Sequence, residues 1–62
     1  MEHHNRPMRL HEAARVANIA EVSLRRLIKA GQGPKHLRLN KLYLIEENSL
    51  AEWLASKRVV AQ

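Results

Sequence analysis

The chain contains no cysteine and no phenylalanine, and Tyr43 and Trp53 are its only aromatic residues. Without cysteine, neither a disulfide nor a thiolate metal site can brace the fold. No apolar run approaches the length of a membrane-spanning helix, and the N-terminus lacks a signal-peptide pattern. We therefore expect one small domain with an aliphatic core, located in the cytoplasm and without a membrane partner.

Arrangements of residues that catalyse reactions or hold metals are also missing. The sequence has no glycine-rich phosphate loop, and no serine stands with a histidine in a catalytic motif. His3 and His4 are adjacent near the terminus, whereas His11 and His36 are isolated, so none has partners at metal-ligand spacing. The sequence predicts no enzyme, no cofactor and no metal site.

Basic residues are abundant, and the formal net charge is +5. Their distribution is uneven, because Lys57 and Arg58 are the only lysine or arginine after residue 41, whereas Glu46, Glu47 and Glu52 all lie there. The positive field thus belongs to the first two thirds of the chain, which favours a polyanionic partner. For any single residue, an ordinary solvated surface is the alternative.

Residues 20–31, AEVSLRRLIKAG, carry the strongest pattern in the chain. Leu24, Leu27 and Ile28 fall at i, i+3 and i+4, which predicts the buried seam of a helix. The opposite side follows the same helical spacing with one apolar and three basic residues, Val22, Arg25, Arg26 and Lys29. Because the planar fork of arginine fits phosphates and the edge of guanine, this helix is predicted to offer its arginines to a nucleic acid.

A shorter helix precedes this one, after an extended entry at Met8–Leu10. We expect it to begin at His11 or Glu12 and to end at Ala17, with small apolar residues facing the core, namely Ala13, Ala14, Val16 and Ala17. Asn18 is predicted to end it in the left-handed conformation, and Ile19 to plug the turn. The basic helix then starts at Ala20 or Glu21 and ends at Gly31. Two short helices joined by a tight turn make a helix-turn-helix.

A hairpin and a last helix follow the QGPK breaker. Residues 36–39 alternate polar and apolar, which predicts a half-buried strand, and residues 42–45 form the returning strand across a two-residue turn at Asn40-Lys41. This hairpin is a wing, with Arg38 and Lys41 near its tip.

The last helix is expected over Glu46–Ser56, packed on both earlier helices and the hairpin through Leu50, Trp53 and Leu54. Trp53 is interpreted as a core residue rather than as a stacking platform for bases. In this division, residues 1–7 are a flexible arm, residues 8–58 a winged helix-turn-helix domain and residues 59–62 a tail.

Several residues, taken in order, resemble one known group of proteins. They are Leu10, Glu12-Ala13-Ala14, Ile19, Ser23-Leu24, Leu27-Ile28, Gly31, Gly33-Pro34, Arg38-Leu39 and Leu50-Ala51-Glu52-Trp53-Leu54. With this pattern the chain resembles, from Met8 to Ser56, the small winged helix-turn-helix proteins of the phage excisionase and AlpA regulator group, whose DNA-binding fold is similar to that of MerR regulators. It departs from the pattern at Asn18, Ala20, Arg25 and Asn40.

The resemblance implies a mainly α fold with a small β-hairpin, three helices plus a two-stranded wing, that binds double-stranded DNA. The second helix would enter the major groove, and the wing would touch an adjacent minor groove or the backbone. The residues carried over are Glu21, Val22, Ser23, Arg25 and Arg26 on the helix, and Arg38 and Lys41 on the wing. From the residues themselves, we expect phosphate contacts from Arg9, Arg15, Lys29, Lys35 and Lys41, while Arg25 or Arg26 contacts a base edge.

In the resembled group, such proteins bind tandem sites cooperatively and bend DNA. The resemblance therefore implies an excisionase, a recombination directionality factor that assists an integrase in excising a phage or other mobile element. Such a protein would be nucleoid-associated in a prokaryotic cytoplasm. The first alternative is a transcriptional regulator, either an AlpA-like activator or a phage-type repressor. The second is a protein-binding antagonist of a larger regulator, with a contact surface at Leu42, Leu44, Val59 and Val60.

Overall fold

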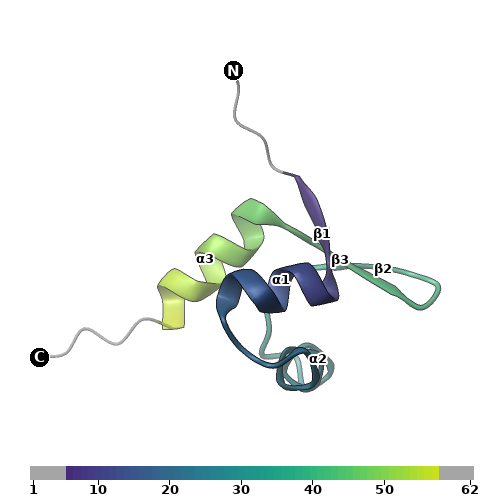
Figure 1. The fold of residues 1–62 in the computed structure, drawn as a ribbon, viewed down its shortest axis with the longest axis horizontal. Helices are drawn as coiled ribbons and strands as arrows, with labels where there is room; N and C mark the ends of the chain where they lie inside the picture. Colours follow the sequence, from purple (N-terminus) through teal and green to yellow (C-terminus); the bar gives the residue numbers. More distant parts are fainter. Residues whose placement is uncertain (1–5, 58–62) are drawn as a thin grey trace, which may run out of the picture.

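Three helices and three short strands make up residues 6–57, the part of the chain that the computed structural model describes (Figure 1). Their order is β1 (Pro7–Arg9), α1 (Leu10–Ala17), α2 (Glu21–Lys29), β2 (Leu37–Leu39), β3 (Leu42–Glu46) and α3 (Glu47–Lys57). This confirms the expected class, a mainly helical fold with a β wing. The expectations for His3, His4, Arg58 and the tail at residues 59–62 lie outside the described residues.

The sheet has three strands rather than the two expected. All pairs are antiparallel in the order β1-β3-β2, and Met8 of β1 lies opposite Ile45 of β3. Both side chains are buried. Pro7, placed in the N-terminal arm by its composition, is the first residue of β1, an edge strand that tolerates the missing N–H of proline.

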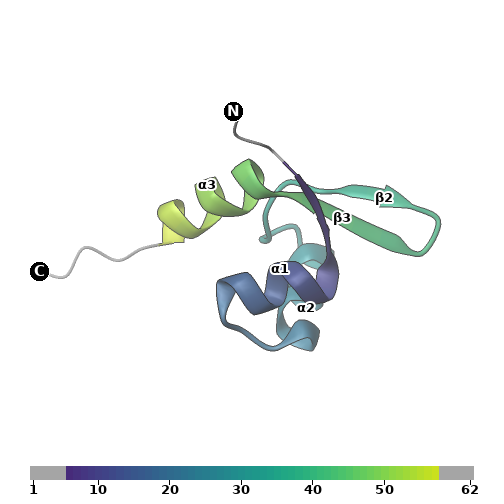
Figure 2. The ribbon, with the colours of Figure 1, turned by 45° about the horizontal axis from the view of Figure 1, so that its top comes forward.

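The β2–β3 hairpin projects beyond the helices, as Figures 1 and 2 show. Its two-residue turn forms as predicted, with Asn40 in the left-handed region at φ 54°. The expected half-burial of the first strand is wrong, because Leu37 and Leu39 are 58% and 54% exposed. None of the helices within residues 6–57 covers this part of the hairpin, since β2 packs mainly on β3.

The core lies between the three helices and the inner face of the sheet, and includes Leu24 and Ile28 of the predicted seam. Val16 does not join it and is 62% exposed, contrary to expectation. The last helix, α3, packs on α1 and β3 rather than on α2. Its link to the α2 region is Trp53, which packs half-buried against the core and donates a hydrogen bond from Nε1 to the carbonyl oxygen of Gln32 at 2.9 Å.

Both helices of the helix-turn-helix end in the same hydrogen-bonded motif. At the end of α1, Asn18 adopts φ 61°, and the N–H of Ile19 donates to the carbonyl oxygen of Ala14 at 3.0 Å. At the end of α2, Gly31 adopts φ 77°, and the N–H of Gln32 donates to the carbonyl oxygen of Leu27 at 2.8 Å. These are Schellman motifs, which confirm the predicted left-handed positions.

The start of α1 falls earlier than predicted, at Leu10. Its first turn is held by the backbone N–H of Arg9, which donates to Oε1 of Glu12 at 3.1 Å. The Arg6 side chain lies between that carboxylate and the one at the start of α3, with Nη1 3.8 Å from Glu12 Oε2 and Nε 3.9 Å from Glu47 Oε2. None of the three described helices has the length and hydrophobicity needed to cross a bilayer.

Candidate nucleic-acid interface

Helix α2 is fixed by one face and presents the other to solvent. Leu24 and Ile28 are buried, whereas Val22 on the far side is 48% exposed. Arg26 and Lys29 are also exposed, and neither side chain makes a hydrogen bond or ion pair with any residue in the range 6–57. An unpaired guanidinium and ammonium on one helix face leave their full charge available to an anionic partner.

Arg25 differs from its neighbour, because it is half-buried and has a partner. Its Nη2 donates to Oε2 of Glu21 at 3.1 Å, one helical turn earlier. The two side chains are about 40–50% exposed, so this ion pair contributes little to stability, and its main effect is to fix the direction of the guanidinium. Ser23 is exposed in the first turn of α2.

The wing residue Arg38 is held against the hairpin itself. Its Nε donates to the carbonyl oxygen of Asn40 and its Nη1 to the hydroxyl of Tyr43, each at 3.0 Å. The guanidinium carbon also lies 4.6 Å from the centroid of the Tyr43 ring, and His36 contacts the ring edge-on, with centroids 5.6 Å apart. Lys41 at the turn is exposed and, within residues 6–57, its side chain makes no hydrogen bond or ion pair.

A cleft of about 170 Å³ brings together several of the predicted site residues. Arg9 lines it from the end of β1 and His11 from the start of α1, Glu21 and Arg25 line it from α2, and Lys41 from the tip of the wing. Three of the basic residues predicted for different tasks therefore share one concave surface. We call this the helix–wing cleft.

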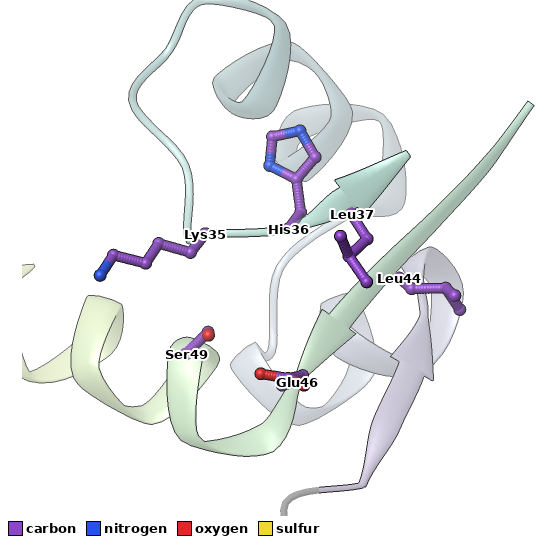
Figure 3. Close-up of a pocket in the computed structure, with 6 residues that line it drawn as sticks. All are labelled: Lys35, His36, Leu37, Leu44, Glu46 and Ser49. Atoms are coloured by element: carbon purple, nitrogen blue, oxygen red, sulfur yellow. The ribbon is translucent and has the colours of Figure 1, made fainter. Parts of the chain in front are cut away.

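Lys35 and Arg15 lie outside the helix–wing cleft. Lys35 lines a separate hollow of about 260 Å³ with Glu46 and Ser49 at the base of the hairpin, where Figure 3 shows it reaching away from the neighbouring leucines. The length of β3 places this base roughly 13 Å from the wing tip. Arg15 follows His11 by four residues on α1, so it lies one turn from the cleft.

The sequence did not predict two residues of this surface, His11 and Tyr43. His11 was considered only as a metal ligand, and its place beside Arg25 and Lys41 depends on tertiary packing. Tyr43 could have been found, because a two-residue turn at Asn40-Lys41 sets Arg38 directly opposite it. In the described part of the chain, no group of three histidine, cysteine or acidic residues could hold a metal ion.

Two short helices joined through a left-handed asparagine, a basic second helix and a projecting hairpin define a winged helix-turn-helix domain. A family model described as a helix-turn-helix domain matches residues 8–58, and the chain belongs to this family. The domain is of a kind that binds double-stranded DNA. No curated protein and no solved structure is significantly similar to the chain.

Proposed function

We propose that the protein binds specific sites on double-stranded DNA, with α2 in the major groove and the wing on the adjacent backbone or minor groove. The observation that supports this proposal is the outward face of α2. Arg26 and Lys29 project there without partners in residues 6–57, on a helix anchored through Leu24 and Ile28. In this role Arg9, Arg15, Lys29, Lys35 and Lys41 contact phosphates, which set the register on the duplex.

Sequence preference comes from the side chains that reach base edges. These are one arginine of α2 together with Glu21, Val22 and Ser23. A bidentate arginine–guanine contact provides about 1–3 kcal/mol of discrimination against the wrong base pair. One α2 helix of nine residues covers few base pairs. Useful specificity in a genome therefore requires several copies on neighbouring sites.

The biological role that we propose is that of an excisionase-type accessory factor. Copies bound cooperatively to tandem sites would bend the DNA and help an integrase to excise a mobile element in a prokaryotic cytoplasm. A regulator of transcription, either activator or repressor, would use the same surface. Adjacency of the gene to an integrase gene favours excision, whereas a selected site inside a promoter favours transcription.

The first experiment is fluorescence anisotropy with a duplex of about 25 base pairs over a range of salt concentrations. Neutralising about five phosphates predicts a log–log salt slope of roughly −4 to −5. Arg25→Ala/Arg26→Ala is expected to weaken binding strongly. A control is Lys57→Ala, which removes one positive charge from the last turn of α3, outside the helix–wing cleft, and is compared with each arginine variant singly. Absence of salt-dependent binding by the wild type would refute the DNA-binding proposal.

A second candidate function, binding of a protein partner, is favoured by one surface. The outer side of the hairpin carries four leucines that we call the leucine face, Leu37, Leu39, Leu42 and Leu44. Exposed apolar patches on a protein surface often mark sites of interaction with other proteins. If protein binding is the function, Leu37→Ser/Leu39→Ser abolishes it and Arg25→Ala/Arg26→Ala leaves it intact. If DNA binding is the function, Arg25→Ala/Arg26→Ala weakens affinity for the duplex and Leu37→Ser/Leu39→Ser does not.

A further inference from the structure

The helix–wing cleft has a lining that suits one particular ligand group. Arg9, Arg25 and Lys41 supply three positive charges, against the single carboxylate of Glu21. The volume of about 170 Å³ corresponds to several water molecules at about 30 Å³ each, which a phosphodiester group would displace. The cleft is thus a concave, cationic site at the junction of the two elements that are proposed to contact DNA.

We propose that the helix–wing cleft binds one backbone phosphate of the DNA, held between Arg25 of α2 and Lys41 of the wing, and that Arg26 is the arginine that contacts a base. This inference rests on the proposed DNA binding and deepens it, because it separates two adjacent arginines that the sequence leaves interchangeable. It also adds His11, which lines the same cleft, to the phosphate-binding residues.

The helical positions of the two arginines support different roles. Leu24 points into the core, and successive residues advance by about 100° around a helix. Arg26 therefore lies close to the far side from the core, whereas Arg25 lies on the flank and lines the cleft that faces the wing. In a helix seated in the major groove, the outermost side chains meet base edges and the flanks meet the sugar-phosphate walls.

The contacts of Arg25 and the position of Lys41 support the same assignment. Arg25 is turned back toward the start of α2 by Glu21, at 3.1 Å from Nη2 to Oε2, so its guanidinium is not extended outward. Four of its five N–H donors remain for an anion. Lys41 lines the cleft from the tip of the wing, and its ammonium group is a compact point charge. Glu21 acts in this arrangement as a positioning residue for Arg25.

The test compares Arg25→Ala, Arg26→Ala and Lys41→Ala on a preferred duplex selected from a random pool, and on variants of that duplex changed at each base pair. Arg25→Ala and Lys41→Ala are each expected to weaken binding to all duplexes by the same factor and to lower the salt slope by about 1. Their effects should not add in the double variant, because both side chains contact one phosphate. Arg26→Ala is expected to cost roughly 5- to 150-fold on the preferred duplex and to abolish the preference at one base pair.

A neutral methylphosphonate placed at each phosphate in turn identifies the one that is bound. At that position the wild type binds the modified duplex more weakly than the unmodified one. Arg25→Ala and Lys41→Ala bind both duplexes with the same, already lowered affinity. Lys57→Ala, which carries the same charge change outside the cleft, should respond as the wild type does. If Arg25→Ala instead relaxes the preference at one base pair, the assignment is overturned while DNA binding stands. If the wild type binds no duplex, the proposed function itself fails.

Discussion

The guanidinium carbon of Arg38 lies 4.6 Å from the centroid of the Tyr43 ring, and its Nη1 donates to the hydroxyl of the same tyrosine at 3.0 Å. The two residues are directly opposite each other in the hairpin. A cation over an aromatic face contributes about 0.5–1 kcal/mol at an exposed site. The side chain that the sequence suggests as a DNA contact therefore also stiffens the wing.

Arg38→Lys should separate these two roles, because it keeps the charge and loses the planar fork that makes both hydrogen bonds. We expect faster amide hydrogen exchange in the hairpin, a loss of about 1 kcal/mol in the free energy of unfolding, and an unchanged salt slope of DNA binding. Lys41→Ala is the control. It should lower the salt slope of DNA binding and leave amide hydrogen exchange in the hairpin unaffected. Weaker DNA binding by Arg38→Lys, at normal exchange rates and with the slope unchanged, would mean that the guanidinium itself contacts DNA.

Trp53→Phe should destabilise the domain by about 1–2 kcal/mol, because it removes the hydrogen bond to Gln32 and leaves part of the indole volume empty. Urea denaturation followed by circular dichroism measures this effect without tryptophan fluorescence. Glu52→Gln, at the exposed neighbouring position of α3, should be close to neutral. An effect of Trp53→Phe on DNA affinity that persists well below the unfolding transition would instead favour base stacking.

Gly31→Ala should cost about 1–2 kcal/mol from the backbone alone. An added Cβ there has no neighbour within 4 Å, but φ is +77°, where alanine is strained. Gly31→Asn should cost less, because asparagine tolerates the left-handed conformation, as Asn18 does at the end of α1. Thermal unfolding distinguishes them, since 1 kcal/mol corresponds to about 4–8 °C in a domain of this size. Equal losses would contradict a backbone origin.

Gly33→Ala should destabilise for a different reason, the close packing of the segment after α2. A Cβ at this position would lie 2.8 Å from Ile28 Cγ1 and 3.1 Å from the Ile28 backbone. Overpacking of this kind costs about 1–3 kcal/mol. Thermal unfolding measures the loss, and shifted amide resonances around Ile28 should accompany it. A variant as stable as the wild type, with those resonances unmoved, would contradict the steric argument.

The helix-turn-helix could be predicted because its signals are local. The spacing of Leu24 and Ile28 defines the buried face of α2, and Asn18 and Gly31 mark the two left-handed helix ends. Each of these features depends on residues within two helical turns. The predicted wing turn at Asn40 is local in the same way.

The errors come from contacts between distant parts of the chain. Strand β1 is only three residues long, and it exists because Met8 pairs with Ile45, which no local pattern reveals. The alternation in β2 was seen correctly, but alternation does not say which face meets the core. Here Arg38 faces Tyr43, while Leu37 and Leu39 face solvent. The helix–wing cleft is likewise a tertiary feature, so the sequence could list its basic residues but not group them.

The leucine face has a consequence for the colloidal behaviour of the protein. Four clustered leucines favour contact between copies, whereas the net charge of +5 opposes it by mutual repulsion. Binding to DNA reduces this repulsion, because the phosphates neutralise part of the positive charge. Sulfate and phosphate buffers shift the balance in the same direction, because these ions screen charge and strengthen apolar association. The protein should therefore disperse best in chloride at low ionic strength.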